Sequence, residues 1–230
     1  MTTIPGNLQH VRARIATACQ RAGRGVEEVT LLAVSKTFGA DAVRAAAAAG
    51  QRAFGENYIQ VGVEKIAALR DLGLMWHCIG PIQSNKTRLV AEHFDWVHTV
   101  DRLKIAERLS AQRPADRPPL NVCIQVNIDG GANKSGVAPG EALALARAVA
   151  ALPQLKLRGL MSIPEIAPDF EAARAVHAGA RALFDQLNAD GLGLDTLSMG
   201  MSDDLEAAIA AGSTMVRIGT AIFGSRAPKP

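Results

Sequence analysis

Short apolar stretches alternate with longer alanine-rich stretches along almost the whole chain. The short stretches are continuous and rich in branched side chains, which favours strands, and the longer ones favour amphipathic helices. The predicted strands are 29–36, 52–55, 75–80, 96–101, 120–128, 156–163, 194–199 and 215–223. The predicted helices are an opening helix over 8–22, followed by 40–49, 59–72, 84–92, 103–112, 139–151, 169–189 and 203–211. Gly50 and Gly212 suit helix C-caps, and Pro139 suits a first helical turn.

This alternation predicts the α/β class. Parallel strands buried on both faces read as continuous apolar runs, and the number of strand–helix units fits a small (β/α)8 barrel of about 200 residues. We therefore predict a single domain over 1–230, a TIM-type barrel with an extra N-terminal helix. The alternative is an open doubly wound sheet, which would carry a glycine-rich phosphate loop after its first strand. The segment 35–39 has no such glycine pattern.

Composition narrows the function classes. The formal net charge is only +3, with basic residues spread among 22 acidic ones, so no nucleic-acid partner is expected. Cys19, Cys78 and Cys123 lack the spacing of a metal or redox motif and are expected to be buried thiols in a reducing compartment. No leader-like N-terminus and no membrane-spanning run is recognisable. We expect a soluble, cytoplasmic monomer that binds no metal.

The first predicted strand ends in a lone lysine, Lys36, after a run of apolar residues. A partly desolvated amine favours its neutral form, and a neutral amine condenses with aldehydes to give a Schiff base. Lys36 is therefore a candidate aldehyde-binding residue. The alternative is a lysine whose stem covers apolar surface while its charge stays in water. Other polar residues also follow predicted strands, at the barrel end where sites of this fold lie.

Two segments near the C-terminus predict an anion site. In 198–204 a strand passes through a glycine and serines into a helix start, and in 217–220 a glycine and a threonine close the last strand. Hydroxyls and backbone N–H groups of this kind bind phosphate, and a phosphate in this barrel commonly lies after strands seven and eight. Ser202 could equally be an ordinary N-cap. The candidate binding residues here are Ser198, Gly200, Met201, Ser202, Gly219 and Thr220.

An amine at one point and an anion site at another predict a ligand with both an aldehyde and a phosphate. Pyridoxal 5'-phosphate (PLP) is the commonest such cofactor. Several motifs then resemble one family, the pyridoxal phosphate homeostasis proteins (YggS/PROSC family), over nearly the whole chain. They are AVSK (33–36), FGENY (54–58), WHCIGPIQSNK (76–86), GLM (159–161), LSMGMSDD (197–204) and VRIGTAIFG (216–224).

This resemblance implies an alanine-racemase-type barrel that holds PLP as a Schiff base on Lys36, with a role in vitamin B6 and amino-acid homeostasis and no established catalysis. It also implies that Arg217 faces the pyridine nitrogen. Asn57 is a candidate for the ring substituents or for a helix N-cap. Cys78 and the segment 130–133 depart from the usual family pattern, and the second departure puts a role for the loop around Lys134 in doubt.

Three functions remain open. A racemase needs a second acid or base opposite Lys36, usually a tyrosine from an added domain, and the chain has one tyrosine, Tyr58, and ends seven residues after Phe223. A sugar-phosphate isomerase needs a glutamate base, for which Glu56 is the one candidate at a strand end. A carrier or buffer, with PLP-dependent apoenzymes as possible acceptors, needs little beyond the lysine and the phosphate site. We favour the carrier, with a cryptic PLP enzyme such as a racemase as the alternative.

Overall fold

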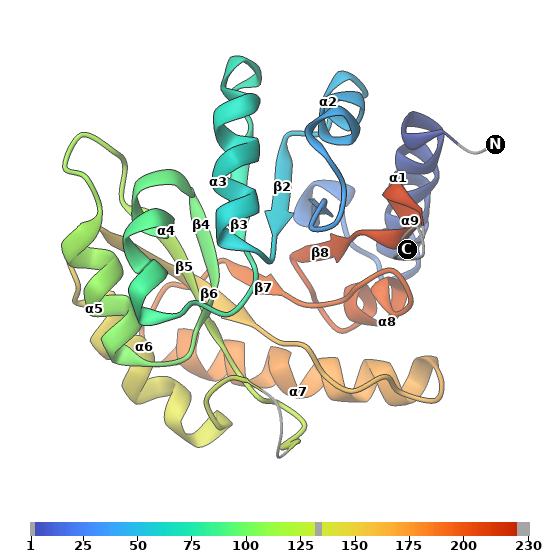
Figure 1. The fold of residues 1–230 in the computed structure, drawn as a ribbon. Coiled ribbons are helices and arrows are strands. Elements are labelled where there is room, and N and C mark those ends of the chain that lie inside the picture. Colours follow the sequence, from blue (N-terminus) through green and yellow to red (C-terminus); the bar gives the residue numbers. More distant parts are fainter. Residues whose placement is uncertain (1–2, 132–134, 225–230) are drawn as a thin grey trace.

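The computed structural model describes residues 3–131 and 135–224, which form a closed barrel of parallel strands (Figure 1). The strands follow one another around the barrel in chain order, and the last pairs with the first. They are β1 (Thr30–Val34), β2 (Ala53–Glu56), β3 (Met75–Cys78), β4 (Trp96–Val100), β5 (Leu120–Gln125), β6 (Leu155–Met161), β7 (Thr196–Ser198) and β8 (Met215–Ile218). The predicted (β/α)8 barrel is confirmed.

Helices surround the barrel between the strands (Figure 1). The helix that precedes β1 is the predicted extra N-terminal helix. The α-helices are α1 (Ile4–Arg21), α2 (Ala40–Ala48), α3 (Ile59–Ala68), α4 (Thr87–His93), α5 (Leu103–Gln112), α6 (Ala142–Ala150), α7 (Phe170–Ala189), α8 (Leu205–Ala210) and α9 (Thr220–Phe223). Short 3-10 turns lie at Val26–Glu28, Arg70–Leu72, Ser84–Lys86 and Pro139–Glu141. No helix of the described ranges is long and apolar enough to cross a bilayer.

The predicted ends of several elements were wrong. β1 stops at Val34, so Lys36 lies in the following turn rather than in the strand. β8 stops at Ile218, and the apolar stretch after Gly219 forms the short helix α9 instead of continuing the strand, because Gly219 adopts φ −114° and ψ −74°. A short apolar run cannot be assigned to strand or helix by its pattern alone. α1 starts at Ile4 rather than residue 8, since Thr3 caps Gly6 N–H and a proline suits the first turn.

Helix α1 covers the outer side of the barrel where β8 meets β1. It contacts α2, α8 and α9, and the last of these is too short to cover the seam alone (Figure 1). Its buried residues, Leu8, Val11, Ile15, Ala18 and Cys19, recur at helical spacing on one face. Arg14, at the edge of this face, reaches Glu206 of α8 at 2.8 Å. The extra helix thus completes the outer layer of the barrel. It lies next to the C-terminal segments that are predicted to form the anion site.

Apolar side chains fill both sides of the strands. Two large clusters lie between the barrel and its helices, and two small ones lie inside the barrel, around Leu32 and Met215 and around Trp96 and Met161. The three cysteines are free and buried, as predicted, and burial raises the pKa of Cys78 and Cys123 to about 12. The predicted C-cap glycines have positive φ, +85° at Gly50 and +99° at Gly212.

Candidate functional site

A cavity of about 270 Å3 lies at the carboxyl ends of the barrel strands. It is lined by Val34, Lys36, Thr37, Phe38, Asn57, Ile79, Ile163, Met201, Ser202, Asp203, Arg217, Gly219, Thr220 and Gly224. The cavity therefore brings together most of the predicted site residues, from segments up to 184 positions apart, since Lys36 and Thr220 both line it. Ser198 and Gly200 are not part of its wall.

Lys36 lies half-buried in the turn after β1. The residue before it, Ser35, is fully buried and tied to two neighbouring elements. Its hydroxyl donates to Glu56 Oε1 at 2.6 Å, and its carbonyl accepts from Lys65 Nζ at 2.7 Å. Lys65 also pairs with Glu56 Oε1 at 2.6 Å. These bonds fix the backbone next to Lys36, whereas its amine has no hydrogen bond or ion pair among the described residues, so it is free to react.

The same network removes Glu56 from the cavity. Its carboxylate is completely buried, with Oε1 shared by Ser35 and Lys65 and Oε2 without a hydrogen-bond partner among the described residues. No glutamate is among the described residues that line the cavity. A carboxylate general base must reach the proton that it removes. The glutamate base that the isomerase alternative needs is therefore absent from the described part of the cavity wall, whose carboxylate is Asp203.

Ser202 lies in a turn, 201–204, that is anchored from two sides. The Asp204 carboxylate accepts the Met201 N–H at 2.6 Å and His177 Nε2 at 2.8 Å, and Arg14 Nη2 donates to the Ser202 carbonyl at 3.0 Å. The predicted free N–H of Met201 is therefore already bonded. Ser202 is not the N-cap of α8, because that helix begins at Leu205 and Asp204 occupies the cap position. Its hydroxyl has no partner among the described residues and lines the cavity.

Gly219 and Thr220 form the opposite part of this wall. Thr220 is the first residue of α9 rather than the end of a strand, and its exposed hydroxyl has no partner among the described residues. A Cβ on Gly219 would lie 3.1 Å from the Val34 carbonyl oxygen, closer than most real contacts. The absence of a side chain there lets the ends of β1 and β8 approach each other. It also leaves backbone exposed to the cavity beside the Thr220 hydroxyl.

Two predicted residues lie behind the cavity. Ser198 is fully buried, and its hydroxyl contacts Arg217 Nη1 at 2.8 Å and His98 Nδ1 at 2.9 Å. Gly200 has φ +93°, its carbonyl accepts the Arg217 N–H at 3.0 Å, and a side chain there would collide with Ala208 of α8. Both residues support the wall instead of forming it.

Among the described residues that line the cavity, Arg217 is the one cation that is also deeply buried. Only 5% of the residue is exposed, its Nη1 donates to Ser198 Oγ, and its Nη2 donates to the Ser162 carbonyl at 2.9 Å. No carboxylate forms an ion pair with it within the described ranges. Burial lowers the pKa of Arg217 to about 10, against a weaker opposing effect of Asp204. A buried guanidinium held only by neutral acceptors favours a ligand that is anionic or rich in electrons.

The remaining predicted residues have varied positions. Asn57 lines the cavity, and the N-cap position of α3 belongs to Tyr58, so the alternative N-cap role of Asn57 is not observed. His77 is buried, and its Nδ1 lies 2.9 Å from His98 Nε2. Lys86 is half-buried in a 3-10 turn outside the cavity wall. Lys134 lies outside the described residues.

Sequence reasoning missed the apolar part of the wall. Val34 and Ile79 end or follow strands on the inner side, and Phe38 stacks on Phe223 with ring centroids 5.2 Å apart. Val34 and Ile79 share one signal, an apolar residue at the carboxyl end of a strand, whereas the predicted site residues near strand ends are mostly polar. His98 was missed as well, because nothing in a sequence indicates that it meets Ser198 across the barrel. The resulting cavity combines apolar side chains with a few polar groups, which is typical of a small-molecule site.

Comparisons with known proteins define the class first. The family model described as alanine racemase, N-terminal domain matches residues 6–227, so the chain is a barrel of that class. Alanine racemase from Corynebacterium glutamicum superposes with a TM-score of 0.65 at 21% identity, over 96% of this chain and 62% of the racemase chain. At that identity the likeness concerns the fold alone.

Curated relatives then define the family. The pyridoxal phosphate homeostasis protein of Pseudomonas aeruginosa is 63% identical over 226 residues, 98% of this chain and 97% of the relative, and that of Escherichia coli is 58% identical over 98% of each. The chain belongs to the pyridoxal phosphate homeostasis protein family. PipY of Synechococcus elongatus, solved with PLP bound, is 38% identical with a TM-score of 0.79, over 91% of this chain and all of PipY.

Proposed function

We propose that this protein binds PLP at the cavity as a Schiff base with Lys36, and that it acts in the cytoplasm as a carrier or buffer in PLP and amino-acid homeostasis. The observation that carries the proposal is the pairing of an unbonded lysine with unbonded hydroxyls across one cavity. The family name and the PLP-bound structure of PipY support it. PLP-dependent apoenzymes are the proposed acceptors, and neither nucleic acid nor membrane is a proposed partner.

The residues present fit the cofactor. PLP carries an aldehyde, a phosphate and a pyridine ring, and when bound it supplies an electron sink. Lys36 offers the amine, and the hydroxyls of Ser202 and Thr220 are free to contact phosphate oxygens. The apolar side chains of Val34 and Ile79 suit a ring face. Asn57 is the proposed contact for the ring substituents, and Met201 and Gly219 complete the wall.

Arg217 is the proposed neighbour of the pyridine nitrogen and favours a carrier over an enzyme. A guanidinium stays protonated and would disfavour a second positive charge on that nitrogen. A ring that is not protonated withdraws electrons less strongly, which weakens PLP as a catalyst. Arg217 would therefore hold the cofactor without activating it.

The alternative is a PLP enzyme such as a racemase. It would need a second acid or base at the cavity, opposite Lys36. Tyr58, the only tyrosine of the sequence, is 58% exposed and does not line the cavity. This position favours the carrier, because Tyr58 cannot serve as that group without a rearrangement of the segment before α3.

Borohydride reduction of the PLP-loaded protein, followed by peptide mapping, tests the binding mode. The cofactor should become fixed to a peptide containing Lys36, and Lys36→Ala should abolish the label. Lys86→Ala is the matched control and should label normally, because Lys86 lies outside the cavity wall. A label on another lysine, or full labelling of Lys36→Ala, would contradict the proposed site.

Chiral chromatography separates carrier from enzyme. The loaded protein is incubated with L- or D-alanine and serine in deuterated water, with an authentic racemase alongside. We expect no sustained racemisation and no more than slow exchange of the lysine linkage. Racemisation within a few orders of magnitude of the control, lost in Lys36→Ala, would establish the enzyme alternative.

A further inference from the structure

A line of polar side chains runs from Arg217 into the barrel interior. Arg217 Nη1 lies 2.8 Å from Ser198 Oγ, Ser198 Oγ lies 2.9 Å from His98 Nδ1, and His98 Nε2 lies 2.9 Å from His77 Nδ1. The four residues belong to β8, β7, β4 and β3, and none is more than 5% exposed. Aliphatic side chains normally fill the interior of this barrel. Polar groups buried there must therefore contribute something that apolar packing does not.

The direction of these hydrogen bonds follows from Arg217. A guanidinium can only donate, so Ser198 Oγ accepts from it and the Ser198 hydroxyl proton must point elsewhere. His98 Nδ1 is the available acceptor. His98 then carries its proton on Nε2 and donates to His77 Nδ1. In this arrangement the His77 Nε2–H is the only group of the line without a partner among the described residues.

The reverse direction satisfies fewer groups. If both histidines donated toward Arg217, Ser198 Oγ would receive two donors, and its own proton would have no acceptor among the described contacts. His77 Nε2 would then be an acceptor without a donor. An unsatisfied buried polar group is expensive, so the direction that starts at Arg217 and leaves one such group is favoured over the direction that leaves two.

The line requires both imidazoles to be neutral, and their surroundings keep them so. Burial lowers the pKa of His77 to about 3. Burial, followed by the effects of His77 and Arg217, holds the pKa of His98 well below 6.5. His77 also stacks on Trp96, with ring centroids 5.1 Å apart and ring planes 11° from parallel. Both rings are therefore held in place and in one tautomer at neutral pH.

We propose that His98, supported by His77, is a positioning residue that orients the Arg217 guanidinium through Ser198. Ser198 on one side and the Ser162 carbonyl on the other hold two nitrogens of the guanidinium, which fixes its plane. With its proton committed to His98, the Ser198 hydroxyl presents a lone pair to Arg217 and becomes a stronger acceptor, since linked hydrogen bonds polarise one another. The consequence for cofactor retention rests on the proposed function.

The tautomers and the mobility of Arg217 can be measured without cofactor. In 15N NMR of the protein without PLP, we expect His98 and His77 to carry their protons on Nε2. We expect the Arg217 Nη1 and Nη2 protons, which donate to Ser198 and to the Ser162 carbonyl, to exchange slowly with water. Ser198→Ala should accelerate that exchange about tenfold, the factor for one hydrogen bond to a charged group. His98→Leu should accelerate it by between about threefold and tenfold, because it weakens that bond without removing it. Met161→Leu is the control, a buried volume-conserving change inside the barrel. A proton on Nδ1 of His98 would overturn the proposal.

A conservative variant separates positioning from packing. His98→Asn keeps an acceptor near the place of Nδ1, so its Arg217 exchange should stay within about threefold of the wild type, while His98→Leu should not. PLP affinity should fall about tenfold in Ser198→Ala. Variants that change only the melting temperature would show a packing role and refute the proposal. Should His98→Leu fail to fold, the wild-type tautomers and Ser198→Ala still decide. Failure of Lys36 labelling would affect only the proposed function, because the NMR measurements use no PLP.

Discussion

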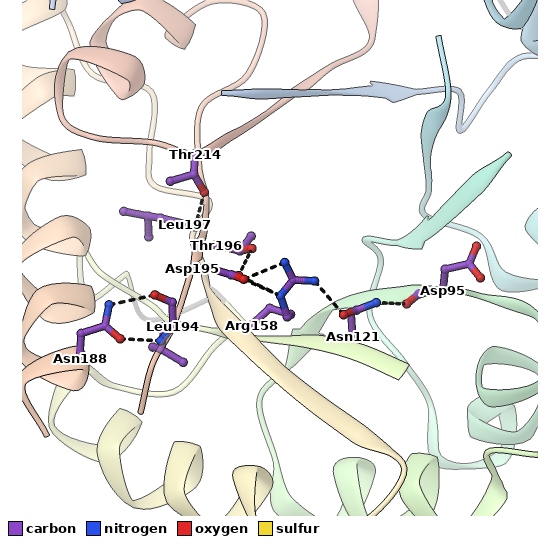
Figure 2. Close-up of polar contacts among 9 residues, drawn as sticks. All are labelled: Asp95, Asn121, Arg158, Asn188, Leu194, Asp195, Thr196, Leu197 and Thr214. Carbon is purple, nitrogen blue, oxygen red and sulfur yellow. Dashed lines mark hydrogen bonds and ion pairs between the residues drawn. The ribbon is translucent and has the colours of Figure 1, made fainter. Parts of the chain in front are cut away.

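Two arginines of the barrel differ in what faces them. Arg158 of β6 lies near the amino ends of the strands, where its Nε is 2.9 and 3.0 Å from the Asp195 carboxylate oxygens and its Nη1 is 2.9 Å from Asn121 Oδ1 (Figure 2). Its guanidinium also lies 4.5 Å from the centre of the Trp96 ring. Asn121 Nδ2 in turn donates to the Asp95 carbonyl at 3.2 Å (Figure 2). The guanidinium of Arg217, at the carboxyl ends, has two hydrogen-bond acceptors within residues 3–131 and 135–224, a hydroxyl and a carbonyl.

This difference indicates that Arg158, near the amino ends of the strands, stabilises the fold, whereas Arg217, at the carboxyl ends, is available to a ligand. A paired guanidinium has its charge and its donors satisfied, so Arg158 joins β5, β6 and the start of β7 without any ligand. An unpaired one in the interior keeps part of its desolvation penalty. Arg217 is in that second state, and it is also the arginine that lines the cavity. A ligand that accepts hydrogen bonds from Arg217 would therefore offset part of this desolvation penalty, and that offset would contribute to its binding.

Acid should lower the free energy of unfolding in two separate pH ranges, one for the interior histidines and one for the Arg158 network. This is the largest effect that we expect. His77 and His98 have lowered pKa values in the folded protein, whereas the unfolded chain takes up their protons near pH 6.5. Their contribution is complete above pH 6.5 and is lost as pH falls toward 3. At pH 5 the loss is about 2 kcal/mol for His77, and the lowered pKa of His98 adds to it. The Arg158 network contains the Asp195 carboxylate. Burial raises its pKa, but hydrogen bonds from Arg158 and Thr196 outweigh burial and hold the pKa below the ordinary value, so this network loses its charge only at lower pH.

Urea unfolding at pH 7.5 and pH 5 measures this loss. His77→Gln should remove about half of the pH dependence, because one buried histidine remains. His10→Gln is the matched control, since His10 is exposed on α1 and should leave the dependence unchanged. Equal stability of the wild type at both pH values would show that the interior histidines accept protons at little cost.

Arg217→Met should separate binding from stability. We expect PLP affinity to fall between about tenfold and a hundredfold, because a charged hydrogen-bond donor is lost. Stability should stay within about 1 kcal/mol or rise, since a buried cation without a carboxylate is replaced by an apolar side chain. PLP titration and urea unfolding give the two numbers. Unchanged affinity with a large loss of stability would make Arg217 a second structural arginine.

Arg158→Met should do the opposite. The Arg158 side chain is 23% exposed and that of Asp195 54%, so solvent screens the pair and the expected loss is about 1 kcal/mol. PLP affinity should remain within about twofold, because Arg158 does not line the cavity. Arg88→Met, which removes an exposed pair with Glu92 at 3.7 Å, should change stability by less than about 0.5 kcal/mol. A large drop in PLP affinity for Arg158→Met would erase the distinction between the two ends.

The sequence was sufficient for the barrel and for one side of the site. Continuous apolar runs that alternate with helical segments predict the strands. Because the carboxyl ends of parallel strands meet at one end of a barrel, Lys36 and Arg217 could be placed together from the sequence, and both line the cavity. The end of β8 was not predictable in this way. The residues after Gly219 are apolar and few, and only the backbone angles at Gly219 turn them into a helix.

The partners of the wall residues were not predictable either. Ser198 and Ser202 look alike in sequence, yet one is buried against His98 and the other lines the cavity. Their difference arises because Ser198 is the last residue of β7 and its side chain lies inside the barrel, whereas Ser202 lies in the turn that follows the strand. Likewise, Asp204 bonds His177, 27 positions away, rather than simply capping α8. Contacts between distant segments require the folded barrel.

Thr220→Ala is the mildest test of the open end. Removing one exposed hydroxyl should weaken PLP binding about threefold to tenfold, because one contact of the phosphate is lost while the backbone at Gly219 remains. Stability should not change measurably, since Thr220 has no partner among the described residues. Thr30→Ala is the matched control, because Thr30 is also exposed but begins β1, at the amino ends of the strands and away from the cavity. Equal PLP affinity in both variants would place the phosphate away from α9, nearer the turn that carries Ser202.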